Sequence, residues 1–342
     1  MTDQDLSNDL TVYVLPVSGG HFVSQLGGIC CLSEQEFDPP DIVFGASGGN
    51  LAAYIASSGF WRKNPILSNC SDISNDHFLT PWIKMIPAWL SFPYFGSLYK
   101  KSIIGVDLFR KWFTPKTIVK TEIWTLAFDE DEYRGQLFCN RSRETSCLHV
   151  SGPTIYGCTD DVIYSNGNVD QIYNSTYASA AMQLIAEPLK MGKNRYSDGG
   201  IMYASPLTPL TFSLVNTVKK EGKFLRLFYF SPYNINSHIP PKMSIYNKSL
   251  GAILHSSQIQ DHAEAVSLLR HFGAHDLKMT KYKTIDNISS ILPKNKHCII
   301  FIIPKNNEEA DYVNFTSENI KTLIRENMTS GFEVEVWEAD VD

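Results

Sequence analysis

The feature that most restricts the fold is a strand, a glycine turn and a helix, which occur twice in succession near the N-terminus. Thr11 to Val17 is a short run of apolar, β-favouring residues that ends at the turn Ser18 to Gly20. Helical composition follows over His21 to Glu34. The order then repeats, because a buried strand over Asp41 to Ala46 precedes a helix over Asn50 to Ser58. Two such units predict a parallel sheet covered by helices, since parallel strands need crossover connections.

Strand and helix patterns alternate through the rest of the chain. Glu122 to Asn140 is predicted to form a β-hairpin around the acidic turn Asp129 to Glu132. Trp61 to Thr117, rich in proline and aromatic residues, is predicted to be an insertion outside the sheet. Since no Gly-, Ser- or Pro-rich linker divides the chain, we expect a tail over residues 1–10 and one α/β domain over residues 11–342. The remaining predicted strands are Phe224 to Phe230 and Cys298 to Ile303, and the remaining helices are Ile259 to Phe272 and Asn307 to Asn327.

Composition and charge exclude several classes of protein. Hydrophobic residues make up 43% and charged residues 19% of the chain, which is ordinary globular usage and argues against disordered or coiled-coil proteins. With 30 Lys+Arg against 36 Asp+Glu, the net charge of -6 argues against a nucleic-acid partner. Seven cysteines without a C-x-x-C pair, and nine histidines without H-E-x-x-H, indicate neither a disulfide framework nor a metal site. The chain also lacks the nucleotide-binding glycine motifs, so we expect no cofactor.

The turn Gly45 to Gly49 reads G-A-S-G-G and matches the motif G-x-S-x-G. It lies between a predicted strand and a predicted helix, which is the context that the motif requires. A serine on so sharp a turn needs glycine neighbours, because a side chain there would collide with the adjacent strand or helix. The helix N-terminus would favour negative charge that develops near the hydroxyl. Ser47 is therefore a candidate nucleophile, and the alternative is a plain glycine-rich β–α turn of the kind that can bind phosphate.

A nucleophilic serine needs a base, and the acidic turn Asp198 to Gly200 reads D-G-G. The small-residue segment Ala178 to Met182, predicted to begin a helix, precedes it, and Ser205 to Leu207 follows it. Together with the turn Ser18 to Gly20 and the G-x-S-x-G motif, in this order, these pieces resemble the patatin-like phospholipase family. The resemblance covers roughly Val12 to Leu207.

The resemblance implies a three-layer α/β/α fold with a mostly parallel central sheet and a Ser-Asp dyad. Ser47 would attack the ester carbonyl of a phospholipid and form an acyl-enzyme, with Asp198 as the base in both steps. Backbone N–H groups of Gly19, Gly20 and His21 would bind the oxyanion. The glycines that support the two motifs are Gly45, Gly48, Gly49, Gly199 and Gly200.

The chain departs from the family's usual G-G-G-x-R/K-G loop. Ser18, Phe22 and Val23 stand where the family has a glycine, a basic residue and a glycine. This departure leaves open a weakly active or inactive homologue that serves as a lipid-binding module. The second alternative is an α/β-hydrolase esterase with a Ser-His-Asp triad. Its histidine would be one of the five late in the chain, His255, His262, His271, His275 and His297.

The most aromatic stretch, Phe78 to Tyr99, lies within the predicted insertion and contains three prolines. Side chains such as Trp82 and Trp89 favour the membrane–water interface, so we predict that this segment docks on lipid near Ser47, with an internal satellite core as the alternative. The first ten residues contain three Asp and no Lys or Arg, unlike a signal peptide. No apolar run is long enough to span a membrane. We expect a cytoplasmic protein that associates peripherally with membranes.

Overall fold

The structure is a computed structural model that describes residues 9–58, 121–148, 150, 158, 161–181, 188–234, 245–305 and 331–340. The predicted insertion over residues 61–117, including the aromatic segment, lies outside the described residues. So does the helix predicted over residues 307–327.

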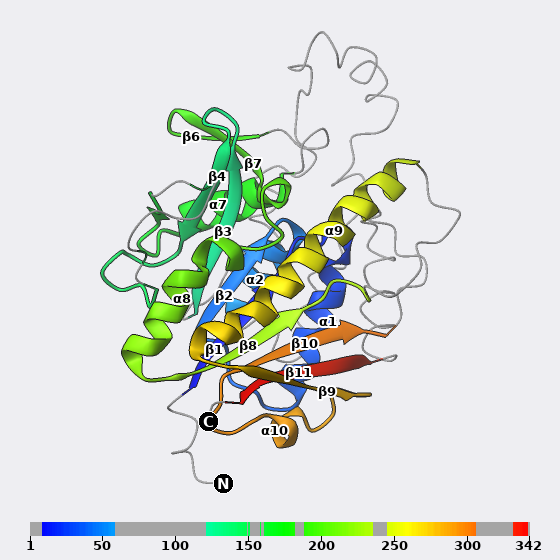
Figure 1. Ribbon diagram of the computed structural model, residues 1–342. Helices are drawn as coiled ribbons and strands as arrows, with labels where there is room; N and C mark the ends of the chain where they lie inside the picture. Colours follow the sequence, from blue (N-terminus) through cyan, green and yellow to red (C-terminus); the bar gives the residue numbers. More distant parts are fainter. Residues whose placement is uncertain are drawn as a thin grey trace.

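One mixed sheet runs through the described part of the chain (Figure 1). Its five central strands are parallel and lie in the order β3, β2, β1, β8 and β10. In that order they span Glu122–Asp129, Ile42–Ala46, Asp9–Leu15, Phe224–Phe230 and Cys298–Pro304. The strands outside this centre are β4 (Arg134–Cys139), β5 (Ile163–Tyr164), β6 (Leu189–Met191), β7 (Asn194–Asp198), β9 (Asp276–Tyr282) and β11 (Phe332–Asp340).

The outer strands extend the sheet at both edges. Beside β10, β11 and then β9 add an antiparallel pair. On the other side, β4 forms an antiparallel hairpin with β3, and β5 runs parallel to β4. Strand β7 also pairs antiparallel with β3, and it forms a second hairpin with β6. The predicted hairpin around the acidic turn Asp129 to Glu132 is thus confirmed.

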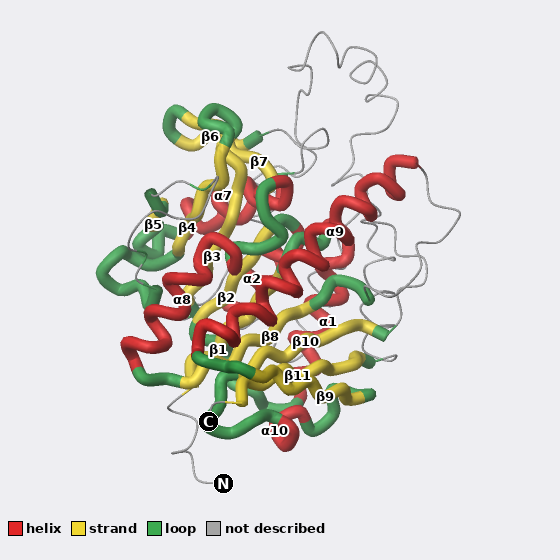
Figure 2. The backbone as a smooth tube through the Cα atoms, in the orientation of Figure 1, coloured by secondary structure: helices red, strands yellow, loops and turns green. Residues whose placement is uncertain are grey.

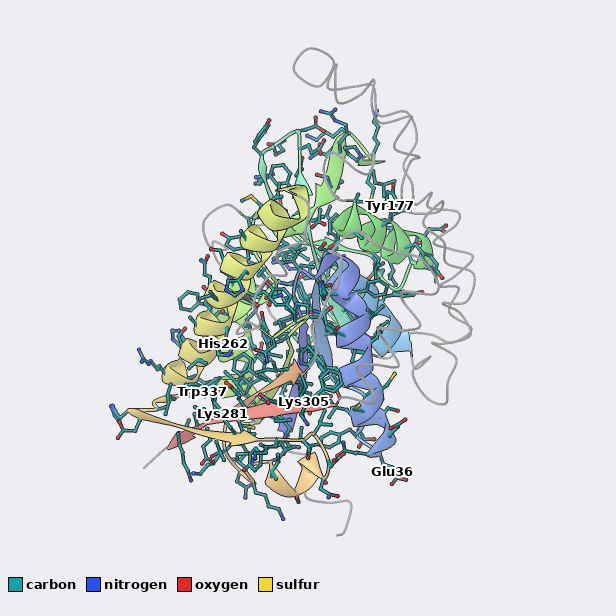
Figure 3. The ribbon with its side chains drawn as sticks, turned by 90° about the vertical axis from the view of Figure 1, so that its right-hand side faces the viewer. Glu36, Tyr177, His262, Lys281, Lys305 and Trp337 are labelled. Atoms are coloured by element: carbon teal, nitrogen blue, oxygen red, sulfur yellow. The ribbon has the colours of Figure 1, made fainter. Side chains whose placement is uncertain are left out.

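Helices cover both faces of this sheet. Figure 2 shows α8 and α9 in front of the strands, and the view turned by 90° in Figure 3 shows α1 and α7 on the opposite side. The three-layer α/β/α fold with a mostly parallel centre is therefore confirmed. The longer helices are α1 (Phe22–Glu34), α2 (Gly48–Ser58), α7 (Val169–Ala180), α8 (Leu207–Glu221) and α9 (Ile245–Leu268). The shorter ones are η1 (Gly19–His21), η3 (Gly199–Ile201), η4 (Leu269–Phe272) and α10 (Ile288–Ile291).

Strand β1 shows how the sheet divides the core into two clusters. Successive side chains of a strand point to opposite faces. Tyr13 and Leu15 accordingly pack in the cluster under α1 and α2, whereas Val12 and Val14 pack in the cluster under α8 and α9. All four side chains are almost fully buried. Burial on both faces is typical of central parallel strands and explains their continuous apolar sequence.

Two helices depart furthest from the predicted boundaries. The late helix predicted from Ile259 begins earlier, at Ile245, and continues into η4. Ala178 does not begin a helix, because it lies in the last turn of α7, which ends at Ala180; Met182 lies outside the described residues. Helix α7 begins after Asn168, whose side chain accepts a hydrogen bond from the backbone N–H of Gln171 and so caps the first turn.

Candidate active site

Ser47 lies on the turn between β2 and α2, in a backbone conformation that is rare for residues other than glycine. Its φ angle is 54°, in the left-handed region, where the Cβ atom is crowded. Non-glycine residues persist in such conformations where the surrounding structure enforces them, and they concentrate at functional sites. The side chain is 2% exposed.

The glycines around Ser47 allow other segments to approach it closely. A Cβ atom at Gly48 would collide with the carbonyl oxygen of Gly19, and one at Gly49 would collide with the carbonyl oxygens of Leu15 and Pro16. At Gly45 it would lie 2.8 Å from the Cβ atom of Ala53 in α2, far inside van der Waals contact. The turn is therefore held between its own helix and the segment that follows β1.

Asp198, the last residue of β7, forms a direct hydrogen bond with Ser47. The Ser47 hydroxyl donates to Oδ2 of Asp198 at 2.6 Å, and the backbone N–H of Gly200 donates to Oδ1 at 2.8 Å. Asp198 is 4% exposed, and burial raises the pKa of its carboxyl to about 6, although both hydrogen bonds oppose the rise. Of the two glycines after Asp198, Gly199 passes so close to Leu126 that a Cβ atom would strike the Leu126 carbonyl.

The end of α7 holds both members of this pair. The backbone N–H of Ser47 donates to Oγ of Ser179 at 3.0 Å, and the Ser179 hydroxyl donates to the carbonyl of Leu126 at 2.6 Å. The backbone N–H of Asp198 donates to the carbonyl of Ala181 at 2.9 Å. Ser179 is fully buried. Sequence reasoning did not assign it a role, and the only signal was its place in a run of small residues before the D-G-G turn.

The loop proposed to bind the oxyanion forms η1 beside the Ser47 turn. Gly19 has a φ angle of 53° and lies against Gly48. The backbone N–H of His21 donates to the carbonyl of Ser18 at 3.0 Å, so this amide is used within the turn itself. The His21 ring packs edge-on against Tyr233, with ring centroids 5.7 Å apart. Of the three amides suggested by the resemblance, those of Gly19 and Gly20 remain candidates in this conformation.

A family model described as patatin-like phospholipase matches residues 18–211. The chain belongs to the patatin-like phospholipase family. VipD from Legionella pneumophila is among the solved structures that resemble the chain, with 10% sequence identity and a TM-score of 0.35 over 94% of this chain and 67% of the VipD chain. A search of curated proteins found no match.

Four of the late histidines of this patatin-like protein contact aromatic rings. His262 stacks on Phe301 with ring centroids 3.7 Å apart, and His297 stacks on Phe272 at 4.0 Å. Burial lowers the pKa of both imidazoles. The other late histidines with a ring contact are His255, beside Tyr233, and His271, beside Phe212. Since the Ser47 hydroxyl is bonded to a carboxylate, the geometry favours the dyad over the triad.

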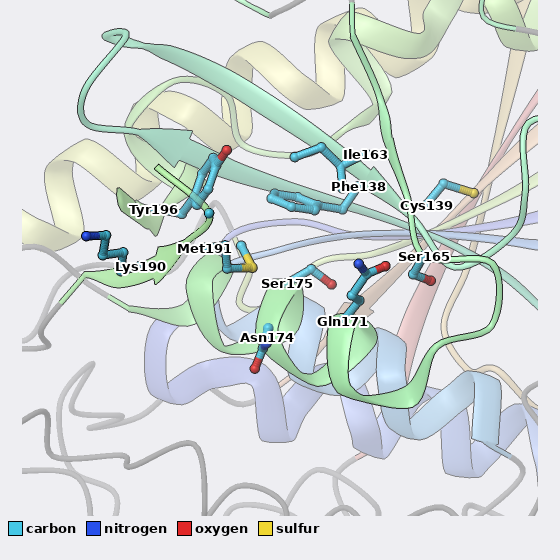
Figure 4. Close-up of a pocket in the computed structure, with 11 residues that line it drawn as sticks. Phe138, Cys139, Ile163, Ser165, Gln171, Asn174, Ser175, Lys190, Met191 and Tyr196 are labelled. Carbon is cyan, nitrogen blue, oxygen red and sulfur yellow. The ribbon is translucent and has the colours of Figure 1, made fainter. Parts of the chain in front are cut away.

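A separate cavity of about 480 Å³ lies beside α7 (Figure 4). Neither Ser47 nor Asp198 lines it. The Lys190 ammonium group points away from the other lining side chains in Figure 4. The cavity is lined by Phe138, Cys139, Ile163, Ser165, Gln171, Asn174, Ser175, Lys190, Met191, Gly192 and Tyr196. The cavity is therefore distinct from the Ser47–Asp198 pair.

Two negative findings apply to the part of the chain that the structure describes. Within it, His, Cys, Asp and Glu side chains form no group of three that could hold a metal ion. No helix of the same residues has the length and apolar character needed to cross a membrane.

Proposed function

We propose that the chain is a lipid acyl hydrolase that cleaves carboxylic esters of phospholipids through Ser47 and Asp198. The observation that carries the proposal is the 2.6 Å hydrogen bond from the Ser47 hydroxyl to Asp198, made on a strand-turn-helix elbow. Both residues lie within the segment that matches the patatin-like family. Family membership supports a lipid ester as substrate, and the hydrogen bond supports the roles of the two residues.

In the first step, Oγ of Ser47 attacks the ester carbonyl while its proton passes to Oδ2 of Asp198. The tetrahedral intermediate collapses to an acyl-serine ester, and the alcohol portion, a lysophospholipid, leaves with the proton from Asp198. A carboxyl with a pKa of about 6 suits this work. It is mostly ionised at neutral pH, yet it is a stronger base than an ordinary exposed carboxylate.

In the second step, Asp198 accepts a proton from water, and the resulting nucleophile attacks the acyl-serine carbonyl. Collapse of this intermediate releases a fatty acid and returns the proton to Oγ of Ser47. Both intermediates place negative charge on the former carbonyl oxygen, which needs preorganised N–H donors. Gly19 and Gly20 are our candidates, because Gly19 lies directly against the Ser47 turn.

The departures from the family's glycine loop fall on residues that face the core. Ser18, Phe22 and Val23 are each exposed by 1% or less, and the last two pack in the cluster under α1 and α2. Phe22 and Val23 therefore act as core residues at the start of α1. Their place in the core supports a loop that folds normally despite these departures.

The proposed substrate is drawn from a membrane surface, so the aromatic segment Phe78 to Tyr99 remains a proposed lipid-docking element, although it lies outside the described residues. Trp and Tyr side chains suit an interface, because their rings are apolar at one end and can form hydrogen bonds at the other. Peripheral association of this kind would present phospholipid esters to Ser47.

The decisive experiment compares fatty-acid release from phospholipid vesicles by the parent and by Ser47→Ala. Loss of a nucleophile should lower turnover by at least about 10³-fold. Ser290→Ala, which replaces an exposed serine on α10, is the control and should match the parent. Undiminished release by Ser47→Ala would contradict the assignment of the nucleophile. Vesicle binding by the parent without any ester cleavage would instead support the lipid-binding module.

A further inference from the structure

Two loops flank the Ser47–Asp198 pair and contact each other. We call them the N-terminal loop (Pro16–His21) and the aspartate loop (Asp198–Ser205). The backbone N–H of Val17 donates to the carbonyl of Ala204 at 2.7 Å. Gly200 lies so close to the Val17 side chain that a Cβ atom there would be 2.5 Å from it. A displacement of either loop must therefore disturb the other.

Helix α9 forms a hydrogen bond with each of these loops. Nε2 of Gln258 donates to the carbonyl of Val17 at 3.3 Å, and Oδ1 of Asp261 accepts from the Ser205 hydroxyl at 2.8 Å. The two side chains are three residues apart, so they lie on one face of the helix. Gln258 is 0% and Asp261 is 2% exposed.

These polar side chains are costly to bury. Burial raises the pKa of the Asp261 carboxyl to about 7, although the hydroxyls of Ser205 and Tyr229 oppose the rise and the nearby Glu264 adds to it. An apolar side chain would avoid the cost of removing these groups from water. The contact of Asp261 also fixes the backbone at the start of α8, because the Ser205 hydroxyl that it binds accepts a hydrogen bond from the backbone N–H of Leu207.

We propose that Gln258 and Asp261 are positioning residues, which hold the N-terminal loop and the aspartate loop at the separation that the Ser47–Asp198 hydrogen bond requires. This inference rests on the proposed function. Both residues lie outside the segment 18–211 that matches the family, so the device belongs to the C-terminal part of this chain. Figure 1 shows α9 crossing the front of the sheet beside α8.

The test uses four variants of the full chain. Gln258→Leu and Asp261→Leu remove the two contacts at similar volume. Asp261→Asn keeps a side-chain oxygen that can accept the Ser205 hydroxyl, so it is the rescue variant. Thr208→Val is the matched control, because Thr208 donates to Glu264 one turn further along α9 and this contact involves neither loop.

Four quantities are measured for each variant. They are kcat and KM on vesicles, the rate of Ser47 labelling by a serine-reactive phosphonate, and hydrogen exchange of the two loops. Small displacements of reacting groups cost large factors in rate, so both Leu variants should lose at least about tenfold in kcat and labelling rate. KM should stay within about twofold, because neither residue is expected to touch substrate. Exchange should rise in both loops, and Asp261→Asn and Thr208→Val should resemble the parent.

Two results would overturn the proposal. One is loss of activity in Thr208→Val equal to that in the Leu variants, which would indicate a general loss of stability. The other is loop exchange in both Leu variants equal to that of the parent. Failure of the proposed function is recognised separately, because the parent would then neither turn over nor be labelled, while the exchange data would still report on the contacts.

Discussion

The hydroxyl of Ser47 donates a 2.6 Å hydrogen bond to Asp198, a residue 151 positions further along the chain. Strand β3 connects the two positions. In the register of the sheet, Ala46 of β2 pairs with Leu126 of β3, and the next residue of β3, Ala127, pairs with Asp198 of β7. Backbone pairing across three strands therefore brings the two residues close together, and the loops that follow β1 and β7 complete their placement.

Replacing Asp198 by asparagine should abolish turnover and increase stability at high pH. Burial raises the pKa of the Asp198 carboxyl from 3.8 to about 6. Between these two pH values the carboxyl is protonated in the folded state and ionised in the unfolded state. The contribution of Asp198 to the stability of the parent therefore falls as pH rises from about 4 to about 6. Each pKa unit corresponds to about 1.4 kcal/mol, and at pH 4 the unfolded carboxyl is already partly ionised. The stability of Asp198→Asn relative to the parent should therefore rise by about 2 kcal/mol between pH 4 and pH 8.

Urea unfolding at both pH values, with vesicle assays at neutral pH, measures this prediction. Asparagine can still accept the backbone N–H of Gly200, so the turn should remain folded. A stability difference that is the same at both pH values would show that Asp198 does not have a raised pKa.

The activity of the parent should rise with pH through about 6. Asp198 has to be ionised in order to accept the proton of Ser47, and its pKa is raised to about 6 by burial. The profile of kcat/KM against pH reports the free enzyme, so its acid limb should have a midpoint near this value. The substrate for this profile is a soluble short-chain ester, because it has no lipid headgroup whose ionisation would affect the rates. An acid limb near the ordinary carboxyl value would contradict the assignment of a buried base.

Replacing Ser179 by alanine should damage both activity and stability. The change leaves the backbone N–H of Ser47 and the carbonyl of Leu126 without this partner. Each buried group left unsatisfied costs about 1–3 kcal/mol, and movement of the Ser47 turn should lower kcat by about tenfold or more. Ser175→Ala is the matched control, because its hydroxyl lies one turn earlier on α7 and bonds to the carbonyl of Ile172 within the helix.

Urea unfolding and kcat are measured together for the two variants. Ser179→Ala should fall in both quantities, whereas Ser175→Ala should keep the kcat of the parent. Equal kcat values for the two variants would remove Ser179 from any role at the site.

Replacing Gly49 by alanine should displace the Ser47 turn. The added methyl group would collide with the carbonyl oxygens of Leu15 and Pro16, which belong to the central strand and the loop that follows it. Backbone cannot yield as a flexible side chain can, so we expect a loss of about 2–3 kcal/mol in the free energy of unfolding, with loss of turnover. Gly192→Ala is the control, since its φ of 62° strains an alanine although the space around it is open.

Thermal and urea unfolding of both variants distinguish the cost of the steric collision at Gly49 from the cost of backbone strain at Gly192. Gly192→Ala should lose about 1 kcal/mol and keep its activity. If Gly49→Ala lost no more stability than Gly192→Ala, the close approach between the Ser47 turn and the segment after β1 would be refuted.

The sequence by itself determined the local units of this fold. The apolar run over Thr11 to Val17 and the buried run over Asp41 to Ala46 predicted β1 and β2, because hydrophobic runs and glycine turns act within a few residues. For the same reason, the G-x-S-x-G turn indicated the position of Ser47 between a strand and a helix. The D-G-G turn indicated Asp198 through the family resemblance.

Tertiary structure decided which of these units meet. No local pattern places β8 beside β1, turns β7 back against β3, or directs Ser179 and α9 to the loops around the site. The prediction that a helix begins at Ala178 was wrong because small residues such as Ala178 and Ser179 suit either end of a helix, and both lie at the end of α7. Long-range contacts depend on strand register and on the packing of two core clusters, which involve residues far apart in the chain. The pairing of Ser47 with Asp198 is a product of that packing.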